Sequence, residues 1–230
     1  MKILIFIPTF NDQNELTRLI SELYKLNHTY TIYVIDDGSV PPIILETDKC
    51  LLFRIPFNAG LGAATSIALH IAKSNNFDFM VRLDADGQHP TQYVQEIIDQ
   101  MILEKHDLCI GQRINNESLD TFRNVLATII KKHINFFSNL ITNNKIKDWS
   151  TGFFALNQLA IQKLTQFDYA RYPEVEIYYN ACHLDLKIST FNIVQLNRAN
   201  GFSSLSLIQS FRLLIRFYLL LIRQILRKIN

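Results

Sequence analysis

The chain has 230 residues, of which 48% are hydrophobic and 19% charged, and its formal net charge is +2. This length suits one α/β domain or one domain with an appendage, and the composition excludes a disordered chain. The small net charge gives no reason to expect nucleic acid as a partner, and no stretch reaches the roughly 18 consecutive apolar residues of a membrane span. Three scattered cysteines are typical of reduced, buried thiols in a cytosolic protein: Cys50, Cys109 and Cys182.

Apolar runs and helical repeats alternate along the chain. Residues 3–7 form a continuous apolar run typical of a buried strand, and apolar residues then recur at helical spacing from 16 to 24. The same reading predicts strands at 30–35, 51–55, 77–83, 108–110 and 186–193, and helices at 63–72, 91–101 and 120–142. This alternation predicts an α/β fold with a mostly parallel central sheet flanked by helices.

Two carboxylates follow the predicted strand at 77–83. Asp84 and Asp86 are separated by one residue, and Gln88 follows after a further residue. Ligands of open α/β sheets bind outside the carboxyl ends of the strands, and Mg²⁺ takes oxygen ligands that it often shares with substrate phosphates. Asp84, Asp86 and Gln88 are therefore candidate ligands of a divalent cation that also contacts a diphosphate. The alternative is a solvated turn, because turns favour Asp and Gly.

Two further polar segments follow predicted strands. Asp37 stands at the end of the strand 30–35, where a carboxylate can accept hydrogen bonds from the base or ribose of a nucleotide. The segment 58–62 begins with Asn58 and precedes a helix, so its backbone N–H groups could face phosphate. It lacks the Gly-Lys-Ser/Thr ending of a P-loop. Each segment alone is equally compatible with an ordinary turn.

Three arginines in the second half of the chain are candidates for anion recognition. Arg113 follows a predicted strand, Arg123 lies in a basic helical region, and Arg198 follows the last predicted strand. The guanidinium group is a fork-shaped donor that matches phosphate oxygens, although any one of these arginines could instead form a surface ion pair.

The tail, residues 205–230, differs from the domain at 1–204. On helical geometry its arginines fall within an arc of about 60°, and most of the remaining circumference is apolar. These arginines are Arg212, Arg216, Arg223 and Arg227. A broad apolar face beside a narrow basic stripe predicts an amphipathic helix in the membrane interface, with the arginines at anionic headgroups. The alternative is a helix that packs on the domain or on a second subunit, so a homo-oligomer stays open.

Several motifs occur in one order between residues 3 and 204, and together they resemble glycosyltransferase family 2. The similar branch contains dolichyl-phosphate mannosyltransferase and bacterial polyprenyl-phosphate glycosyltransferases. The motifs are Ile7-Pro8-Thr9-Phe10-Asn11, Asp36-Asp37-Gly38-Ser39, Asn58-x-Gly60, Asp84-Ala85-Asp86-Gly87-Gln88-His89, Gly111-Gln112-Arg113, the segment 148–154 and Arg198-x-x-Gly201-x-Ser203. Two departures concern the acceptor side: Trp149 stands where the branch usually has Pro, and Ala127 where it usually has Ser.

The resemblance implies a GT-A fold, a nucleotide-diphospho-sugar donor, and Mg²⁺ or Mn²⁺ as cofactor. Carried over by position, it implies that Asp84, Asp86 and Gln88 hold the metal. The arginines at 113, 123 and 198 would face the acceptor phosphate or the donor diphosphate, and Asp86, Arg113, Arg198 and Glu176 would be catalytic. The nucleotide pocket would be lined by Pro8, Phe10, Asp12, Asp37, Asn58 and Asp84.

The resulting expectation is an inverting transfer of sugar to a polyprenyl phosphate by an enzyme that lies peripherally on the cytoplasmic face of the membrane. One alternative is a saccharide hydroxyl as acceptor, with Glu176 as the base that removes its proton. Two remoter alternatives are a sugar nucleotidyltransferase and a catalytically silent binding module. The chain lacks the Gly-rich phosphate loop that sugar nucleotidyltransferases use, which counts against the first alternative. The acidic metal ligands are all present, which counts against the second.

Overall fold

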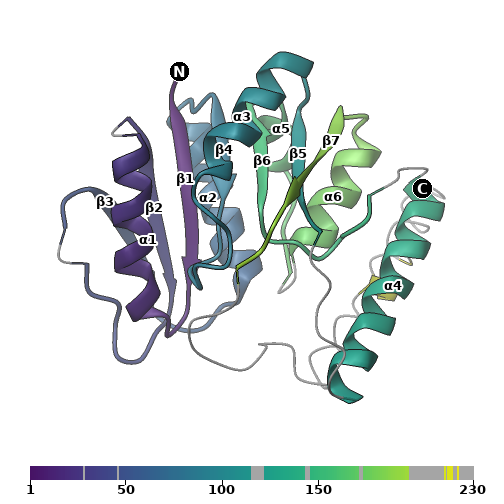
Figure 1. Cartoon of the computed structure of the whole chain (residues 1–230), viewed down its shortest axis with the longest axis horizontal. Coiled ribbons are helices and arrows are strands. Elements are labelled where there is room, and N and C mark those ends of the chain that lie inside the picture. Colours follow the sequence, from purple (N-terminus) through teal and green to yellow (C-terminus); the bar gives the residue numbers. More distant parts are fainter. Residues whose placement is uncertain are drawn as a thin grey trace.

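The computed structural model describes residues 1–27, 29–45, 47–114, 122–142, 146–170 and 173–196, together with 215, 217–219 and 222. Strands and helices follow one another along this chain (Figure 1). In order they are β1 (Ile3–Thr9), α1 (Gln13–Leu26), β2 (Thr31–Asp37), β3 (Cys50–Ile55), α2 (Leu61–Ser74), β4 (Phe79–Arg82), α3 (Tyr93–Glu104), β5 (Leu108–Arg113), α4 (Phe122–Thr142), β6 (Phe154–Asn157), α5 (Gln158–Leu164), α6 (Pro173–His183) and β7 (Ile188–Ile193).

The strands form one seven-stranded sheet in the order β3-β2-β1-β4-β6-β5-β7. All neighbouring pairs are parallel except those of β6, which is antiparallel to both β4 and β5. The predicted mostly parallel sheet is therefore confirmed. β6 and the short helix α5 after it were not predicted, because a four-residue strand leaves no periodic signal in the sequence.

Helices cover both faces of the sheet and bury it. One core contains side chains of α1 and α3 packed on the sheet, and the other contains side chains of α2, α5 and α6 (Figure 1). Every residue of β1 is buried, as expected for a central strand covered on both faces. On α2 the small side chains of Ala64, Ala68 and Ala72 are fully buried, which lets this helix lie close to the sheet.

The three cysteines only partly match their prediction. Cys109 is buried in β5, and burial raises the pKa of its thiol to about 11 despite a hydrogen bond with Ser189. Cys50 and Cys182 are only half-buried, because they lie on an edge strand and near the end of α6. All three cysteines lie in the described part of the chain, and none of them forms a disulfide bond.

The long helix α4 lies beside the rest of the domain and contacts part of the tail (Figure 1). Ile130 and Ile134 of α4 belong to the same buried cluster as Phe217, and His133 hydrogen-bonds to Tyr218 at 2.5 Å. The predicted domain boundary at residue 204 and the four tail arginines lie outside the described residues. Among the helices of the described ranges, none has the length and apolar character that a membrane crossing requires.

Candidate active site

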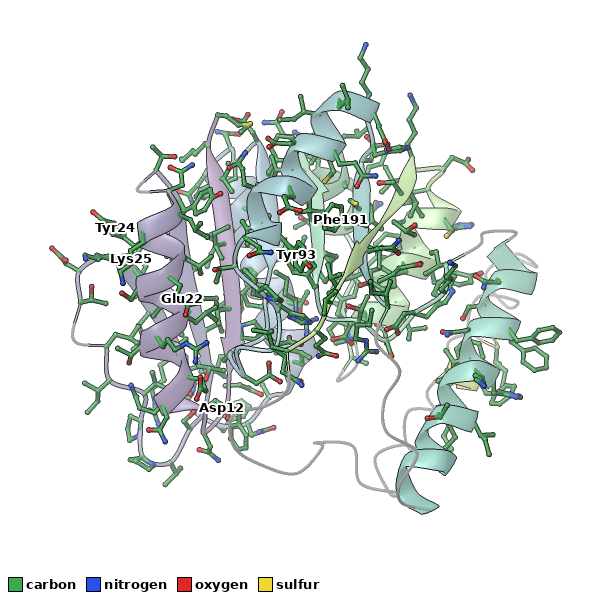
Figure 2. The ribbon with its side chains drawn as sticks, in the orientation of Figure 1. Asp12, Glu22, Tyr24, Lys25, Tyr93 and Phe191 are labelled. Atoms are coloured by element: carbon green, nitrogen blue, oxygen red, sulfur yellow. The ribbon has the colours of Figure 1, made fainter. Side chains whose placement is uncertain are left out.

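The chemistry-bearing residues gather at one edge of the sheet. Because β1, β2, β4, β5 and β7 are parallel, their carboxyl ends lie at the same edge, and antiparallel β6 begins there. Asp12, at the start of α1, lies at this edge in Figure 2. Asp84 and Asp86 follow β4, and Arg113 ends β5. The topology therefore brings Asp84, Asp86 and Arg113 to one edge of the sheet.

A chain of three charged side chains lies beneath this edge. The guanidinium of Arg82, which is 1% exposed, donates to Asp84 Oδ1 at 2.9 Å through Nη2 and contacts Glu174 Oε1 at 2.7 Å through Nη1. Arg82 is the last residue of β4, and Glu174 lies in the first turn of α6. A buried arginine therefore joins the first predicted metal ligand to a buried glutamate.

The three charges shift one another's pKa values. Burial acts to lower the pKa of Arg82, but the carboxylates of Glu174 and Asp84 outweigh it and raise this pKa. Burial acts to raise the pKa of Asp84, but the charge of Arg82, with smaller contributions from His89 and Arg113, lowers it. For Glu174 burial prevails over Arg82, so its pKa is raised. Asp84 is therefore a carboxylate at neutral pH.

The donor atoms of the Asp84–Asp86 loop fit a divalent cation. Asp84 is 34% exposed, and its Oδ2 atom receives no hydrogen bond from the residues that the structure describes. Asp86 lies two residues on and accepts a hydrogen bond from the Gln88 backbone N–H at 3.1 Å. Within the described ranges no three His, Cys, Asp or Glu side chains form a metal site. Mg²⁺ commonly uses one or two carboxylates and completes its shell with substrate phosphates, so this pair fits a cation shared with a diphosphate.

Gln88 connects this loop to the segment after β7. The side-chain Nε2 atom of Gln88 donates to the Leu196 carbonyl at 3.3 Å, and the backbone carbonyl of Gln88 accepts from the Leu196 N–H at 2.9 Å. Leu196 precedes Arg198 by two residues in the sequence. That Gln88 is a metal ligand stays a prediction, and Arg198 lies outside the described residues.

His89 is a buried part of the same loop. Its Nδ1 atom accepts a long hydrogen bond, 3.4 Å, from the Asp84 backbone N–H, and its ring packs on Phe153 with centroids 5.5 Å apart. Burial lowers the pKa of His89 against the opposing charges of Asp84 and Asp86. The imidazole therefore connects the backbone of the loop at Asp84 to the buried ring of Phe153.

Arg113 does not point freely into the site. Its Nε and Nη2 atoms bind Asp148 Oδ2 at 2.6 and 2.5 Å, and Nη2 also donates to the Ser150 hydroxyl at 3.0 Å. Burial acts to raise the pKa of Asp148, but Arg113 and the hydrogen bonds from Ser150 lower it. Asp148 thus fixes the direction of the guanidinium, a role that the sequence did not reveal. Arg123 belongs to α4, but its side chain lies outside the described residues.

Two asparagines of α4 fix the segment that carries Asp148. The Asn139 side chain bonds to the backbone N–H and carbonyl of Ile146 at 3.1 and 2.8 Å and accepts from Trp149 Nε1 at 2.9 Å. Asn135 accepts from the Trp149 backbone N–H at 3.1 Å. The Trp149 side chain is fully buried and anchors this segment in the core. The branch that the sequence resembles usually has Pro at this position.

Asp37, one of the residues predicted to line the nucleotide pocket, holds the backbone of a neighbouring loop. Its two carboxylate oxygens accept hydrogen bonds from the Ala59 and Gly60 N–H groups at 2.8 and 2.9 Å. These two N–H groups are therefore not directed at a phosphate, contrary to one expectation for the segment 58–62. Phe10 is 45% exposed, and Asp12 and Asn58 are also exposed, whereas Pro8 is buried in β1. Their contacts with a nucleotide stay predictions.

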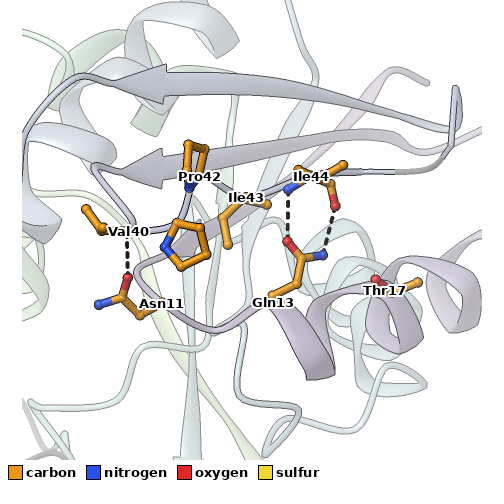
Figure 3. Close-up of a pocket in the computed structure, with 8 residues that line it drawn as sticks. Asn11, Gln13, Thr17, Val40, Pro42, Ile43 and Ile44 are labelled. Carbon is orange, nitrogen blue, oxygen red and sulfur yellow. Dashed lines mark hydrogen bonds between the residues drawn. The ribbon is translucent and has the colours of Figure 1, made fainter.

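A cavity of about 500 Å³ lies between the start of α1 and the segment 40–44 that follows β2 (Figure 3). Gln13 bonds to both backbone groups of Ile44, at 2.8 and 2.9 Å, and Asn11 Oδ1 accepts from the Val40 N–H at 2.9 Å. The lining residues, 11, 13, 17 and 40–44, include none of the predicted nucleotide or metal residues. This cavity is therefore separate from the carboxylate loop.

The two glutamates of α6 differ in their surroundings. Glu174 is buried against Arg82, whereas Glu176 is half-buried and accepts a hydrogen bond from the Ala170 N–H at 3.1 Å. Of the two, only Glu176 has the exposure that a proton acceptor for a substrate needs.

Sequence reasoning did not identify Arg82, since an arginine in an apolar run looks like an isolated polar residue until its partner is known.

Comparison with known proteins agrees with this geometry. Residues 4–165 match the profile of the family described as "Glycosyl transferase family 2". A UDP-N-acetylglucosamine–dolichyl-phosphate N-acetylglucosaminyltransferase from Methanococcus voltae is 25% identical over 71% of this chain and 72% of its own length. A dolichol-phosphate mannosyltransferase from Pyrococcus furiosus is 29% identical over 70% of this chain and 48% of its own length.

A solved structure with the same fold is glucosyl-3-phosphoglycerate synthase from Mycobacterium tuberculosis, in complex with Mn²⁺, UDP and glucosyl-3-phosphoglycerate. It superposes with a TM-score of 0.68 at 15% identity and covers 94% of this chain and 78% of its own. At this identity the likeness concerns the fold alone, and that fold is the predicted GT-A type. With the family match over residues 4–165, the chain belongs to glycosyltransferase family 2.

Proposed function

We propose that this glycosyltransferase moves a sugar from a nucleotide-diphospho-sugar to a polyprenyl phosphate, with inversion at the anomeric carbon. The observation that carries the proposal is the meeting of Asp84 and Asp86 with Arg113 at one sheet edge of a family 2 domain. Two relatives with names that describe transfer to dolichyl phosphate support the acceptor class.

In this proposal Asp84 and Asp86 hold Mg²⁺ or Mn²⁺. The Mn²⁺ and UDP in the solved structure with the same fold support this choice. Bound there, the cation neutralises negative charge on the leaving nucleoside diphosphate. The protein's own part includes keeping Asp84 ionised, which the lowered pKa of its carboxyl group favours.

A polyprenyl phosphate carries an anionic oxygen near neutral pH, so its attack needs no general base. It does need a positive group that holds the phosphate near a donor that is itself anionic. Arg113, fixed by Asp148 and Ser150, supplies a directed guanidinium at this edge. Arg123 and Arg198 are proposed to complete the phosphate site, and Phe10, Asp12 and Asn58 to contact the nucleotide.

In this proposal the acceptor lies at a membrane surface beside α4 and the tail. Ile129 and Phe136 of α4 are 56% and 64% exposed, and Ile215 and Leu219 of the tail are 59% and 58% exposed. We propose that residues 205–230 form a basic amphipathic appendage to the catalytic domain 1–204 and hold it on the cytoplasmic membrane face, with apolar side chains in the interface and arginines at anionic headgroups.

A saccharide acceptor is the second candidate, favoured by the half-exposed Glu176 in the first turn of α6. A sugar hydroxyl must lose its proton on attack, and Glu176 would take it.

The deciding experiment offers both acceptors. The full chain is incubated with Mn²⁺, a panel of labelled nucleotide sugars, and either undecaprenyl phosphate or soluble oligosaccharides. The proposal predicts label in the organic phase and release of nucleoside diphosphate, and Glu176→Gln should leave this transfer unchanged. Label confined to oligosaccharide and lost in Glu176→Gln would replace the lipid acceptor by the saccharide acceptor. Release of pyrophosphate would indicate nucleotidyl transfer.

A further inference from the structure

The charged chain of Glu174, Arg82 and Asp84 is unusual because its middle member has no access to solvent or substrate. Arg82 is 1% exposed, and the side chain of Glu174 is 10% exposed. The ring of Phe154 covers Arg82, whose Cζ atom lies 5.8 Å from the ring centroid. Arg82 therefore cannot bind a substrate itself, and it acts only through the two carboxylates.

A buried ion pair needs a reason beyond stability. Removing charges from water costs free energy that their mutual attraction rarely repays in full, and apolar side chains of similar volume often serve as well or better. Arg82 lies at the junction of β4, β6 and α6, on the face of the sheet where the rings of Phe154 and Tyr178 are fully buried. The two charges are therefore best explained by their effect on Asp84.

Counting the charges shows what Glu174 contributes. Asp84 and Asp86 alone carry −2, and Arg82 brings this total to −1. Glu174 returns it to −2, the charge that balances a divalent cation. Without Glu174 the arginine would neutralise half of the metal site from within the protein.

The contacts also distinguish the two oxygens of Asp84. Arg82 binds Oδ1, whereas Oδ2 receives no hydrogen bond from the described residues and remains for a cation, and Gly152 packs against both oxygens. Residues behind the metal ligands commonly set ligand orientation and basicity, and their replacement typically weakens metal binding.

We propose that Glu174 is a positioning residue of the metal site, which offsets the charge of Arg82 so that the site keeps a net charge of −2 for a divalent cation. This inference rests on the proposed function. It also separates the two glutamates of α6: Glu174 binds Arg82 and serves the donor side of the site, whereas Glu176 accepts a hydrogen bond from the Ala170 N–H.

The test measures Mn²⁺ binding to the full chain by calorimetry and by electron paramagnetic resonance, without a sugar donor, so that it does not depend on activity. Glu174→Gln keeps the shape of the side chain and removes its charge. We expect Mn²⁺ binding about 10- to 100-fold weaker than in the wild type. Glu176→Gln, on the same helical turn, is the matched control and should bind Mn²⁺ as the wild type does. Equal Mn²⁺ affinity in Glu174→Gln and the wild type would overturn the inference.

A double variant covers the case in which Glu174→Gln does not fold. Arg82→Met together with Glu174→Leu removes one positive and one negative charge, so the site keeps −2, and the buried pair becomes apolar. We expect this variant to fold and to bind Mn²⁺ within about threefold of the wild type, since apolar replacement of a buried pair is often tolerated. A folded double variant that binds Mn²⁺ more than tenfold more weakly would overturn the charge argument.

The same titration distinguishes the two levels of the account. A wild type that binds no Mn²⁺, with or without added UDP or GDP, removes the metal from the proposed function and this inference with it. A wild type that binds Mn²⁺ and is matched by Glu174→Gln leaves the proposed function standing and removes only the role of Glu174.

Discussion

Gly152 lies directly against the carboxylate of Asp84. A Cβ atom at position 152 would fall 2.5 Å from Oδ2 and 2.7 Å from Oδ1 of Asp84, and 2.9 Å from Arg82 Nη2. Non-bonded atoms do not approach so closely, so any side chain at this position must displace the carboxylate. The glycine in the motif segment 148–154 therefore has a steric reason beside the proposed metal ligand Asp84.

We predict that Gly152→Ala lowers metal-dependent sugar transfer by about 100-fold, because a displacement near 1 Å at a reacting site has costs of this order. The measurement is initial rate of nucleoside diphosphate release at saturating Mn²⁺, with circular dichroism to confirm folding. A folded Gly152→Ala enzyme with the wild-type rate would show that the position of Asp84 does not matter.

The contact of Asp148 with Arg113 predicts a change in acceptor binding. Asp148→Asn keeps the size of the side chain but removes the charge that directs the guanidinium. We expect KM for polyprenyl phosphate to rise about tenfold, roughly the free energy of one charge-assisted hydrogen bond. Steady-state kinetics with varied acceptor and constant donor test this, and an unchanged KM would mean that Arg113 does not face the acceptor.

The same pair predicts a pH dependence of stability. The pKa of Asp148 is lower in the folded protein than its ordinary value of 3.8, so its charge stabilises the fold above that value. This contribution is lost as the pH falls below 3.8 and through the folded-state pKa. Urea unfolding of the wild type and Asp148→Asn from pH 7 to pH 3 should show a constant difference near neutrality that shrinks at the acid end. A difference that grows with acid would contradict this sign.

Replacement of Asn139 should lower the stability of the fold, although this residue has no proposed role in catalysis. Its side chain makes three hydrogen bonds to Ile146 and Trp149. Replacement by Ala leaves these partners unsatisfied and should cost about 3 kcal/mol of unfolding free energy, at about 1 kcal/mol per bond. Asn14→Ala, at an exposed position of α1, is the control and should be neutral within about 0.5 kcal/mol. Similar unfolding midpoints for both variants would contradict the assigned role.

The tail is best tested by charge removal, because truncation would also uncover α4 where Phe217 is buried. Replacing Arg212, Arg216, Arg223 and Arg227 by Gln keeps the apolar face. At roughly 1 kcal/mol for each arginine near an anionic membrane, the four changes should reduce binding to phosphatidylglycerol vesicles by more than 100-fold. Sedimentation with vesicles measures this, and neutral phosphatidylcholine vesicles are the control. Undiminished sedimentation with anionic vesicles would show that the stripe does not bind membranes.

Much of the fold could be predicted from the sequence because its strands are continuous apolar runs. β1 is one such run, and β2 and β5 were also found near their observed bounds. β6 could not be predicted, since its four residues gain their strand conformation from pairing with β4 and β5 on both sides.

The candidate site could be predicted only in part. The position of Asp84 and Asp86 at a strand end follows from local sequence, and so does that of Arg113. The partners of these residues do not, because Glu174 reaches Arg82, and Asp148 reaches Arg113, only when distant elements pack together. Asp37 likewise has partners that local sequence does not reveal, because its carboxylate accepts hydrogen bonds from the backbone of a neighbouring loop, and its contact with a nucleotide stays a prediction.

The most direct test of the account is the rate of nucleoside diphosphate release from a sugar nucleotide, with undecaprenyl phosphate present, as a function of Mn²⁺ concentration. The wild type should be inactive in EDTA and show saturable dependence on Mn²⁺, and Asp86→Ala should lose at least about 1000-fold at every concentration, as loss of one metal ligand would predict. Wild-type rates in EDTA, or in Asp86→Ala without added metal, would contradict the central claim that these carboxylates hold the cation that serves the donor diphosphate.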